Sequence, residues 1–164
     1  MSDRIRVAEV GDARAIAEAQ VAGWHTAYRG LVPDARLDAF TVELRVPAWA
    51  RHVAGGSRSR TTVCERGGRV VGFISVGASR DADGWGEVWA LYALPETWGT
   101  GAGRALLDEG LAWLASRDLR RVMLWVLDGN ARAIRFYRAA GFELTGARET
   151  KDDLRHLEMA RTPR

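Results

Sequence analysis

Five small residues follow one another near the middle of the chain: Gly99, Thr100, Gly101, Ala102 and Gly103. They come after an apolar run at residues 87–94, which is typical of a strand buried on both faces, and before a helical repeat of apolar residues. Glycines let backbone amides approach a ligand closely, and a helix start adds free N–H groups and a positive dipole end. The stretch predicts an anion site, although small residues can also serve close packing alone.

Two common phosphate-binding motifs do not fit these residues. A P-loop needs Gly-Lys followed by Ser or Thr at the helix start, whereas Ala102, Gly103 and Arg104 follow Gly101 here. A dinucleotide fingerprint needs a glycine where Arg104 stands, which argues against a nucleotide-dependent oxidoreductase. Arg104 is therefore either a charged contact to the anion or a solvated side chain.

The pattern that remains is Trp98-x-x-Gly101-x-Gly103. It resembles the Gln/Arg-x-x-Gly-x-Gly/Ala signature of the GNAT superfamily of acetyl-CoA-dependent N-acetyltransferases. Trp98 stands where the family usually has Gln or Arg, so a side-chain contact differs while the backbone cradle is retained.

A second segment supports the same resemblance. It reads Asn130-x-x-Ala133-x-x-x-Tyr137-x-x-x-Gly141-Phe142 and is similar to the other characteristic segment of the family. The two segments occur in the family's order and separation. The resemblance covers the C-terminal half strongly and the N-terminal half through its order of elements.

The resemblance implies that acetyl-CoA binds as a cosubstrate. Its pyrophosphate would lie on the glycine loop, and its pantetheine arm would enter a gap between two parallel strands that splay apart. Strand residues would offer backbone groups to the pantetheine amides while their side chains pack in the core. The residues expected to contact acetyl-CoA are Leu91, Tyr92, Ala93, Leu94, Trp98, Gly99, Thr100, Gly101, Ala102, Gly103, Arg104, Asn130 and Tyr137.

Tyr137 and Glu87 are the catalytic candidates. By resemblance, Tyr137 is the general acid that protonates the leaving CoA thiolate. Glu87 opens the apolar strand where some family members place a catalytic glutamate, and a carboxylate at the mouth of an apolar cleft has a raised pKa suited to a base. The alternatives are a core tyrosine bonded elsewhere and a solvated strand-end charge. Asn130 can cap its helix as well as bind the cosubstrate.

The acceptor is expected to be a small-molecule or peptide amine. By family analogy Trp24, Tyr28 and Trp89, with Trp85, lie near it, and core packing is the alternative for each. The expected reaction is direct attack of a primary amine on acetyl-CoA in a ternary complex. A route through Cys64 is disfavoured because no base neighbours it in sequence. The alternative function is a non-catalytic acyl-CoA-binding or regulatory module.

The elements that must position these residues follow from periodicity and from chain breakers. We expect Asp12 to cap a helix that runs to about residue 28, and Pro47 to interrupt a helix at residues 41–53. The remaining expectations are a strand at 4–10, a short helix around Leu37 and Phe40, a hairpin of strands 61–65 and 69–76 around Gly67 and Gly68, a strand at 87–94, a helix through 103–114, a strand from 122, a helix that begins after Asn130 and is stopped by Gly141, and strands at 143–147 and 154–160 joined by a turn at 150–153.

This order predicts an α/β fold with a mixed sheet, in one domain of residues 1–164. The resemblance to the GNAT superfamily implies that the sheet is mostly antiparallel, with helices on both faces and a splayed central parallel pair. No run approaches the ~20 apolar residues of a membrane span, and the N-terminus has no signal-peptide pattern. With one cysteine and three scattered histidines, we expect no metal. The chain's 24 basic and 21 acidic residues intermix, so we expect no nucleic acid partner. Without a membrane-span or signal-peptide pattern, we expect a cytoplasmic location, and a homodimer is compatible with the sequence.

Overall fold

The computed structural model describes residues 3–56 and 58–163 of the chain, and within these ranges a seven-stranded sheet has the order β1-β2-β3-β4-β5-β7-β6. Neighbouring strands are antiparallel except β4 and β5, as the family resemblance implies. The strands are β1 Asp3–Val7, β2 Ser59–Arg66, β3 Arg69–Ala78, β4 Gly86–Ala93, β5 Val122–Leu127, β6 Glu143–Lys151 and β7 Leu154–Arg161. The helices are α1 Ala13–Tyr28, α2 Asp34–Ala39, α3 Val42–Ala54, α4 Ala102–Ser116 and α5 Ala131–Ala139, with 3-10 turns at Val10–Asp12 and Pro95–Thr97.

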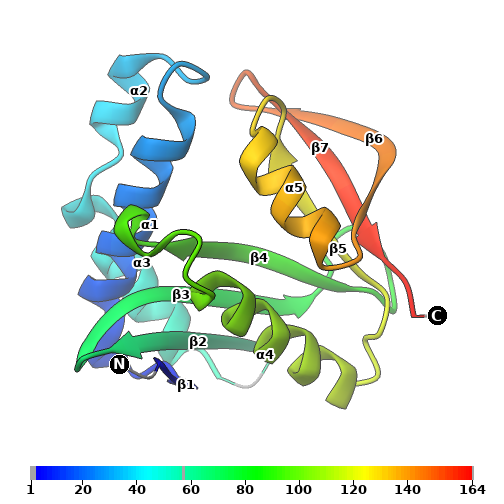
Figure 1. The fold of residues 1–164 in the computed structure, drawn as a ribbon, viewed down its shortest axis with the longest axis horizontal. Helices are drawn as coiled ribbons and strands as arrows, with labels where there is room; N and C mark the ends of the chain where they lie inside the picture. Colours follow the sequence, from blue (N-terminus) through cyan, green and yellow to red (C-terminus); the bar gives the residue numbers. More distant parts are fainter. Residues whose placement is uncertain (1–2, 57, 164) are drawn as a thin grey trace.

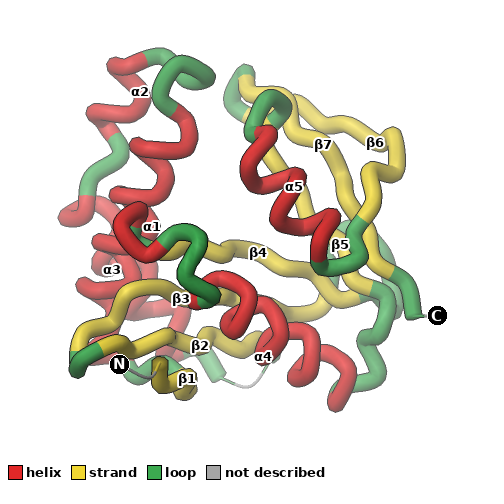
Figure 2. Tube along the Cα trace, in the orientation of Figure 1, coloured by secondary structure: helices red, strands yellow, loops and turns green. Residues whose placement is uncertain are grey.

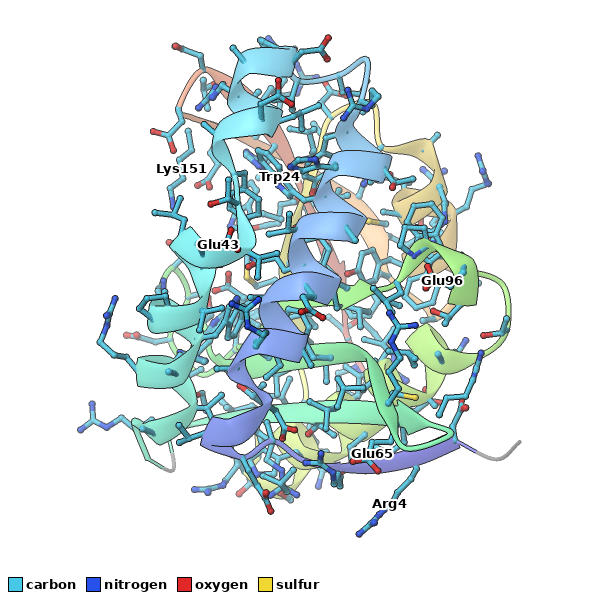
Figure 3. All side chains as sticks on the ribbon, turned by 90° about the vertical axis from the view of Figure 1, so that its left-hand side faces the viewer. Arg4, Trp24, Glu43, Glu65, Glu96 and Lys151 are labelled. Atoms are coloured by element: carbon cyan, nitrogen blue, oxygen red, sulfur yellow. The ribbon has the colours of Figure 1, made fainter. Side chains whose placement is uncertain are left out.

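Helices cover both faces of the sheet. Successive residues of a strand point to opposite faces, and Phe73 and Ile74 of β3 show which helix lies on each. The ring of Phe73 packs against Trp49 of α3, with 4.9 Å between ring centroids, and α1 and α3 lie side by side on this face (Figure 3). Ile74 lies against Gly110 of α4 on the opposite face. The expected two-sided covering is confirmed.

The central parallel pair separates almost as soon as it forms. β4 and β5 are in register only at Gly86 with Val122 and at Glu87 with Met123. Beyond these two pairs the sheet divides into β1 to β4 and β5 to β7, with α4 and α5 in front of the two parts (Figure 1), and the two groups of strands diverge (Figure 2). A β-bulge accompanies the separation, because Trp89 is an extra residue on β4 between Val88 and Ala90. The splayed pair is confirmed.

Two expectations for the N-terminal half are wrong. Pro47 does not interrupt α3, which is continuous because its apolar face, including Trp49, packs on the core and outweighs one missing amide. Asp12 stands at the start of α1, but its carboxylate makes no capping bond there. It pairs with Arg6 at 2.8 Å and accepts the Glu9 N–H at 2.8 Å instead.

The ends of several strands differ from the predicted ones. β1 stops at Val7 and a 3-10 turn follows, and β6 extends beyond the expected residue 147 to Lys151. The turn between β6 and β7 lies at Asp152 and Asp153, both in the left-handed backbone region. The β2–β3 hairpin turns at Gly67 and Gly68 as predicted, with φ of 61° and 79°.

Candidate active site

A cleft opens where β4 and β5 diverge, and we call it the central cleft. Its walls are residues 88–93 of β4, residues 124–126 of β5, one face of α5, and the end of α1. Trp98 and Gly103, from the loop after β4 and the first turn of α4, complete the lining. Because β4 and β5 do not pair here, their facing backbone groups are available to a ligand or to water.

The glycine loop leaves room for a ligand at the start of α4. Gly99 and Gly101 have φ of 77° and 97°, and a Cβ built on either would meet no atom within 4 Å. Gly101 is the N-cap of α4 and has no side chain to cap it, so the N–H groups of the first turn have no partner within the helix. Gly103 lines the cleft, whereas Ala102 is fully buried in the core. The loop therefore has the form of an open anion cradle.

The polar side chains of the loop are bonded to the protein. Trp98 donates its Nε1–H to the carbonyl of Ala93 at 3.0 Å, which holds the indole at the edge of the cleft. Thr100 accepts from Arg66 at 3.0 Å. Arg104 pairs with Asp108 at 3.0 Å, one turn along its own helix. This geometry fits the solvated alternative for Arg104 rather than a contact to the anion.

Tyr137 lies in the wall opposite β4. Asn130 caps α5 by accepting the Ala133 N–H at 3.3 Å, which sets the helix start from which Tyr137 follows. The Tyr137 side chain is 9% exposed, and its ring packs edge-on against Phe136 and Phe142. Burial raises the pKa of its hydroxyl, so Tyr137 is protonated at neutral pH.

Two further tyrosines share the cleft. The hydroxyls of Tyr28 on α1 and Tyr92 on β4 lie 3.5 Å apart, and burial raises the pKa of both. Leu91 and Ala93 line the cleft beside Tyr92, whereas Leu94 is buried and donates its N–H to Val71. The cleft is therefore rich in neutral hydroxyl groups.

Glu87 stands at the closed end of the cleft, in the last paired position of β4. Its side chain is turned toward residues 79–81, where Oε1 accepts the Arg80 N–H at 3.4 Å, and it is not part of the cleft lining. Burial raises its pKa, and the charge of Asp81 raises it further. Glu87 thus has a raised pKa and lies beside the cleft rather than in it.

The aromatic acceptor candidates fall into two groups. Tyr28 and Trp89 line the cleft. Trp89 has its Nε1 buried with no partner among the described residues, and Arg80 lies 4.8 Å over its ring. Trp24 instead packs against Phe40 and Tyr28 behind the cleft. Trp85 lies under Arg121, outside the cleft lining.

Sequence reasoning missed Arg132. It lies in the first turn of α5, lines the cleft, and places its guanidinium carbon 3.5 Å from the centre of the Trp98 ring. Arg132 is exposed overall, and partial burial of its guanidinium lowers its pKa, although the group remains charged at neutral pH. Its position two residues after Asn130 in the second motif was the signal that could have identified it.

Comparisons with known proteins agree with this geometry. The model of the acetyltransferase (GNAT) family matches residues 22–142. The uncharacterized N-acetyltransferase YuaI of Bacillus subtilis is 31% identical over 155 residues, which cover 88% of this chain and 87% of that protein. A mycothiol acetyltransferase of Thermobispora bispora is 44% identical, but over 49% of this chain and only 28% of its own length.

Solved structures share the fold. The PaiA N-acetyltransferase from Thermoplasma acidophilum, solved in complex with coenzyme A, superposes with a TM-score of 0.81 at 19% identity and covers 99% of this chain and all of that one. Nourseothricin acetyltransferase is 31% identical with a TM-score of 0.58, over 63% of this chain and 65% of its own.

Among the described residues, no group of three or more His, Cys, Asp or Glu side chains is placed to hold a metal ion. Across residues 3–56 and 58–163, no helix has both the length and the apolarity that a membrane crossing needs.

Two glycines of α4 give a matched test of the cradle. A Cβ on Gly103 would lie 3.5 Å from the Phe136 ring, an ordinary contact at the edge of the cleft, whereas one on Gly110 would lie 2.8 Å from Ile74. Gly103→Leu should therefore weaken CoA binding about tenfold or more, or ~1.4 kcal/mol, with little change in melting temperature. Gly110→Ala should instead lower stability, since overpacking costs about 1–3 kcal/mol, and leave affinity unchanged. Calorimetric titration and thermal melts measure both, and unchanged affinity in folded Gly103→Leu would refute the cradle.

Proposed function

The chain belongs to the GNAT family of acetyltransferases, and from this premise we propose that the central cleft transfers acetyl from acetyl-CoA to a primary amine. The observation that carries the proposal is the early separation of β4 and β5, which opens a cleft between the anion cradle of α4 and the buried hydroxyl of Tyr137. A cleft bounded in this way suits a long ligand with phosphate at one end and a reactive thioester at the other.

The residues of the cleft fit acetyl-CoA. The first turn of α4 offers N–H groups to the pyrophosphate, beside glycines where no side chain fills the space. The unpaired edge of β4 offers backbone groups to the two amides of the pantetheine arm, as a strand edge does to a peptide. The Ala93 carbonyl is already bonded to Trp98, so residues nearer the bulge at Trp89 are the better partners.

The chemical step is attack of the amine nitrogen on the acetyl carbonyl. The new C–N bond forms and the C–S bond breaks. The acylated nitrogen releases its extra proton to water, and sulfur leaves as a thiolate that needs a proton. Tyr137 is the proposed donor, because its raised pKa keeps the hydroxyl protonated until negative charge develops on sulfur.

The amine arrives as an ammonium ion and must lose a proton before it attacks. We assign this task to Glu87, because burial raises the pKa of its carboxyl group and so strengthens it as a base. Since its side chain faces residues 79–81 and not the cleft, the proton would reach it through water. Asp81, which accepts the Trp125 indole N–H at 3.1 Å, adds negative charge beside Glu87.

Direct attack is favoured over a covalent acetyl-enzyme. Cys64 is fully buried in β2, and burial raises the pKa of its thiol to about 11, so little thiolate is present at neutral pH. Steady-state kinetics should therefore give the intersecting pattern of a ternary complex rather than the parallel lines of a ping-pong mechanism.

The cytoplasmic location of the protein and its assembly as a homodimer stay predictions.

Thiol release from acetyl-CoA, measured against a panel of amines, tests the proposed function. The panel should range from amino acids, polyamines and lysine peptides to acceptors of the mycothiol and nourseothricin type, because two relatives are named for these compounds. Acetylation of any amine supports the proposal. Tight acetyl-CoA binding with no amine acetylated would favour the non-catalytic acyl-CoA-binding module.

Tyr137→Phe keeps the ring packed against Phe136 and Phe142 and removes only the hydroxyl. Turnover with the best amine should fall by about 10²-fold, the usual scale of general acid catalysis, while acetyl-CoA affinity changes little. Tyr28→Phe, in the same cleft, is the control and should lose much less. Equal losses of rate and affinity in Tyr137→Phe would indicate a structural role.

Glu87→Gln keeps the shape of the side chain and removes its basicity. Glu87 accepts a proton only when it is ionised, so wild-type kcat/KM should rise as the pH passes through the pKa of Glu87. Burial places this pKa above the ~4.3 of an ordinary glutamate. The variant's deficit should be largest near neutral pH and shrink at high pH, where more amine arrives deprotonated. A variant profile that parallels the wild type at every pH would remove Glu87 from the mechanism.

A further inference from the structure

Arg132 and Trp98 meet across the central cleft. Trp98 belongs to the loop between β4 and α4, and Arg132 belongs to the first turn of α5 on the other wall. The guanidinium carbon lies 3.5 Å from the centre of the indole ring, which is the distance of direct stacking. The indole is itself fixed by its bond to the Ala93 carbonyl at 3.0 Å. Trp98 therefore forms a rigid platform under a cation.

The charge of Arg132 is not matched by the protein. No carboxylate among the described residues pairs with it, whereas Arg104, on the neighbouring helix, pairs with Asp108 at 3.0 Å. Two ionisable groups lie close enough to act on the Arg132 charge. Tyr137 is neutral at pH 7 because its pKa is raised, and the positive charge of Arg135 repels Arg132. Arg132 is therefore a positive charge that no carboxylate of the described residues neutralises, and it can bind an anionic ligand.

Stacking leaves the binding edge of the guanidinium free. The interaction with Trp98 uses the flat face of the group, while its N–H donors lie in the plane and project from the edge. A planar fork of donors matches two phosphate oxygens at once. Gly103, whose amide belongs to the open first turn of α4, lines the same cleft. The cation and the cradle can therefore act on one anion.

We propose that Arg132, supported by Trp98, binds the pyrophosphate of the CoA donor together with the first turn of α4. This assignment rests on the proposed function and extends it to a residue of α5. It also accounts for Trp98, which stands where the GNAT signature usually has Gln or Arg. In this chain the side-chain contact to the pyrophosphate comes from Arg132 on the other wall of the cleft, and Trp98 positions Arg132 by stacking on it.

Binding of three ligands by the Arg132→Ala variant tests the assignment. CoA carries both a pyrophosphate and a 3′-phosphate, dephospho-CoA keeps only the pyrophosphate, and pantetheine has neither. Calorimetric titration should show affinities for CoA and dephospho-CoA that fall equally, by about tenfold to a hundredfold, the scale of a charge-assisted bidentate contact. Affinity for pantetheine should not change.

Arg138→Ala is the matched control, because Arg138 is exposed like Arg132 and lies on the same helix, but outside the cleft lining. It should bind all three ligands like the wild type. A loss for CoA but not for dephospho-CoA would assign Arg132 to the 3′-phosphate and overturn the proposal. An equal loss for pantetheine, or no difference from Arg138→Ala, would overturn it as well. Failure of the wild-type protein to bind CoA at all would instead contradict the proposed function.

Discussion

The end of backbone pairing between β4 and β5 is the constraint on which the active site depends. Parallel strands normally continue their ladder, since unpaired N–H and C=O groups are costly when they are not hydrated or bonded. Here the ladder stops after Glu87 and Met123, and the extra residue at Trp89 bends β4 away. The protein thus places unsatisfied backbone groups in a cleft, where a ligand with amides can replace water.

Other contacts hold the two halves of the divided sheet in place. At the closed end the β4–β5 pairs join them. At the far side, a small apolar cluster around Val32, Leu37 and Leu127 links the α1–α2 region to β5, and Arg36 contacts the β6–β7 turn. The Trp98–Arg132 stack adds a contact near the cradle. The cleft is therefore held on both sides, and Tyr137, the proposed proton donor, has a defined position in one wall.

Local signals in the sequence predicted most of these elements but not their cross-cleft contacts. Spacing within a single segment was enough to predict the glycine loop in one case, and the Asn130 cap with the position of Tyr137 in the other. The splay was accessible only through the family resemblance, because strand separation depends on packing of distant elements. The uninterrupted helix through Pro47 and the pairing of Asp12 with Arg6 show tertiary contacts overriding local preference. Arg132 was missed because its partner Trp98 lies in a different motif.

The central claim is that the gap between β4 and β5 binds the donor, with phosphate at the start of α4 and sulfur at Tyr137. A crystal structure with acetyl-CoA bound tests it most directly. We expect the pyrophosphate within hydrogen-bond distance of the amides of Ala102 and Gly103, the pantetheine arm along the unpaired edge of β4, and the thioester sulfur within reach of the Tyr137 hydroxyl. Acetyl-CoA bound elsewhere, or bound with its sulfur far from Tyr137, would contradict the account.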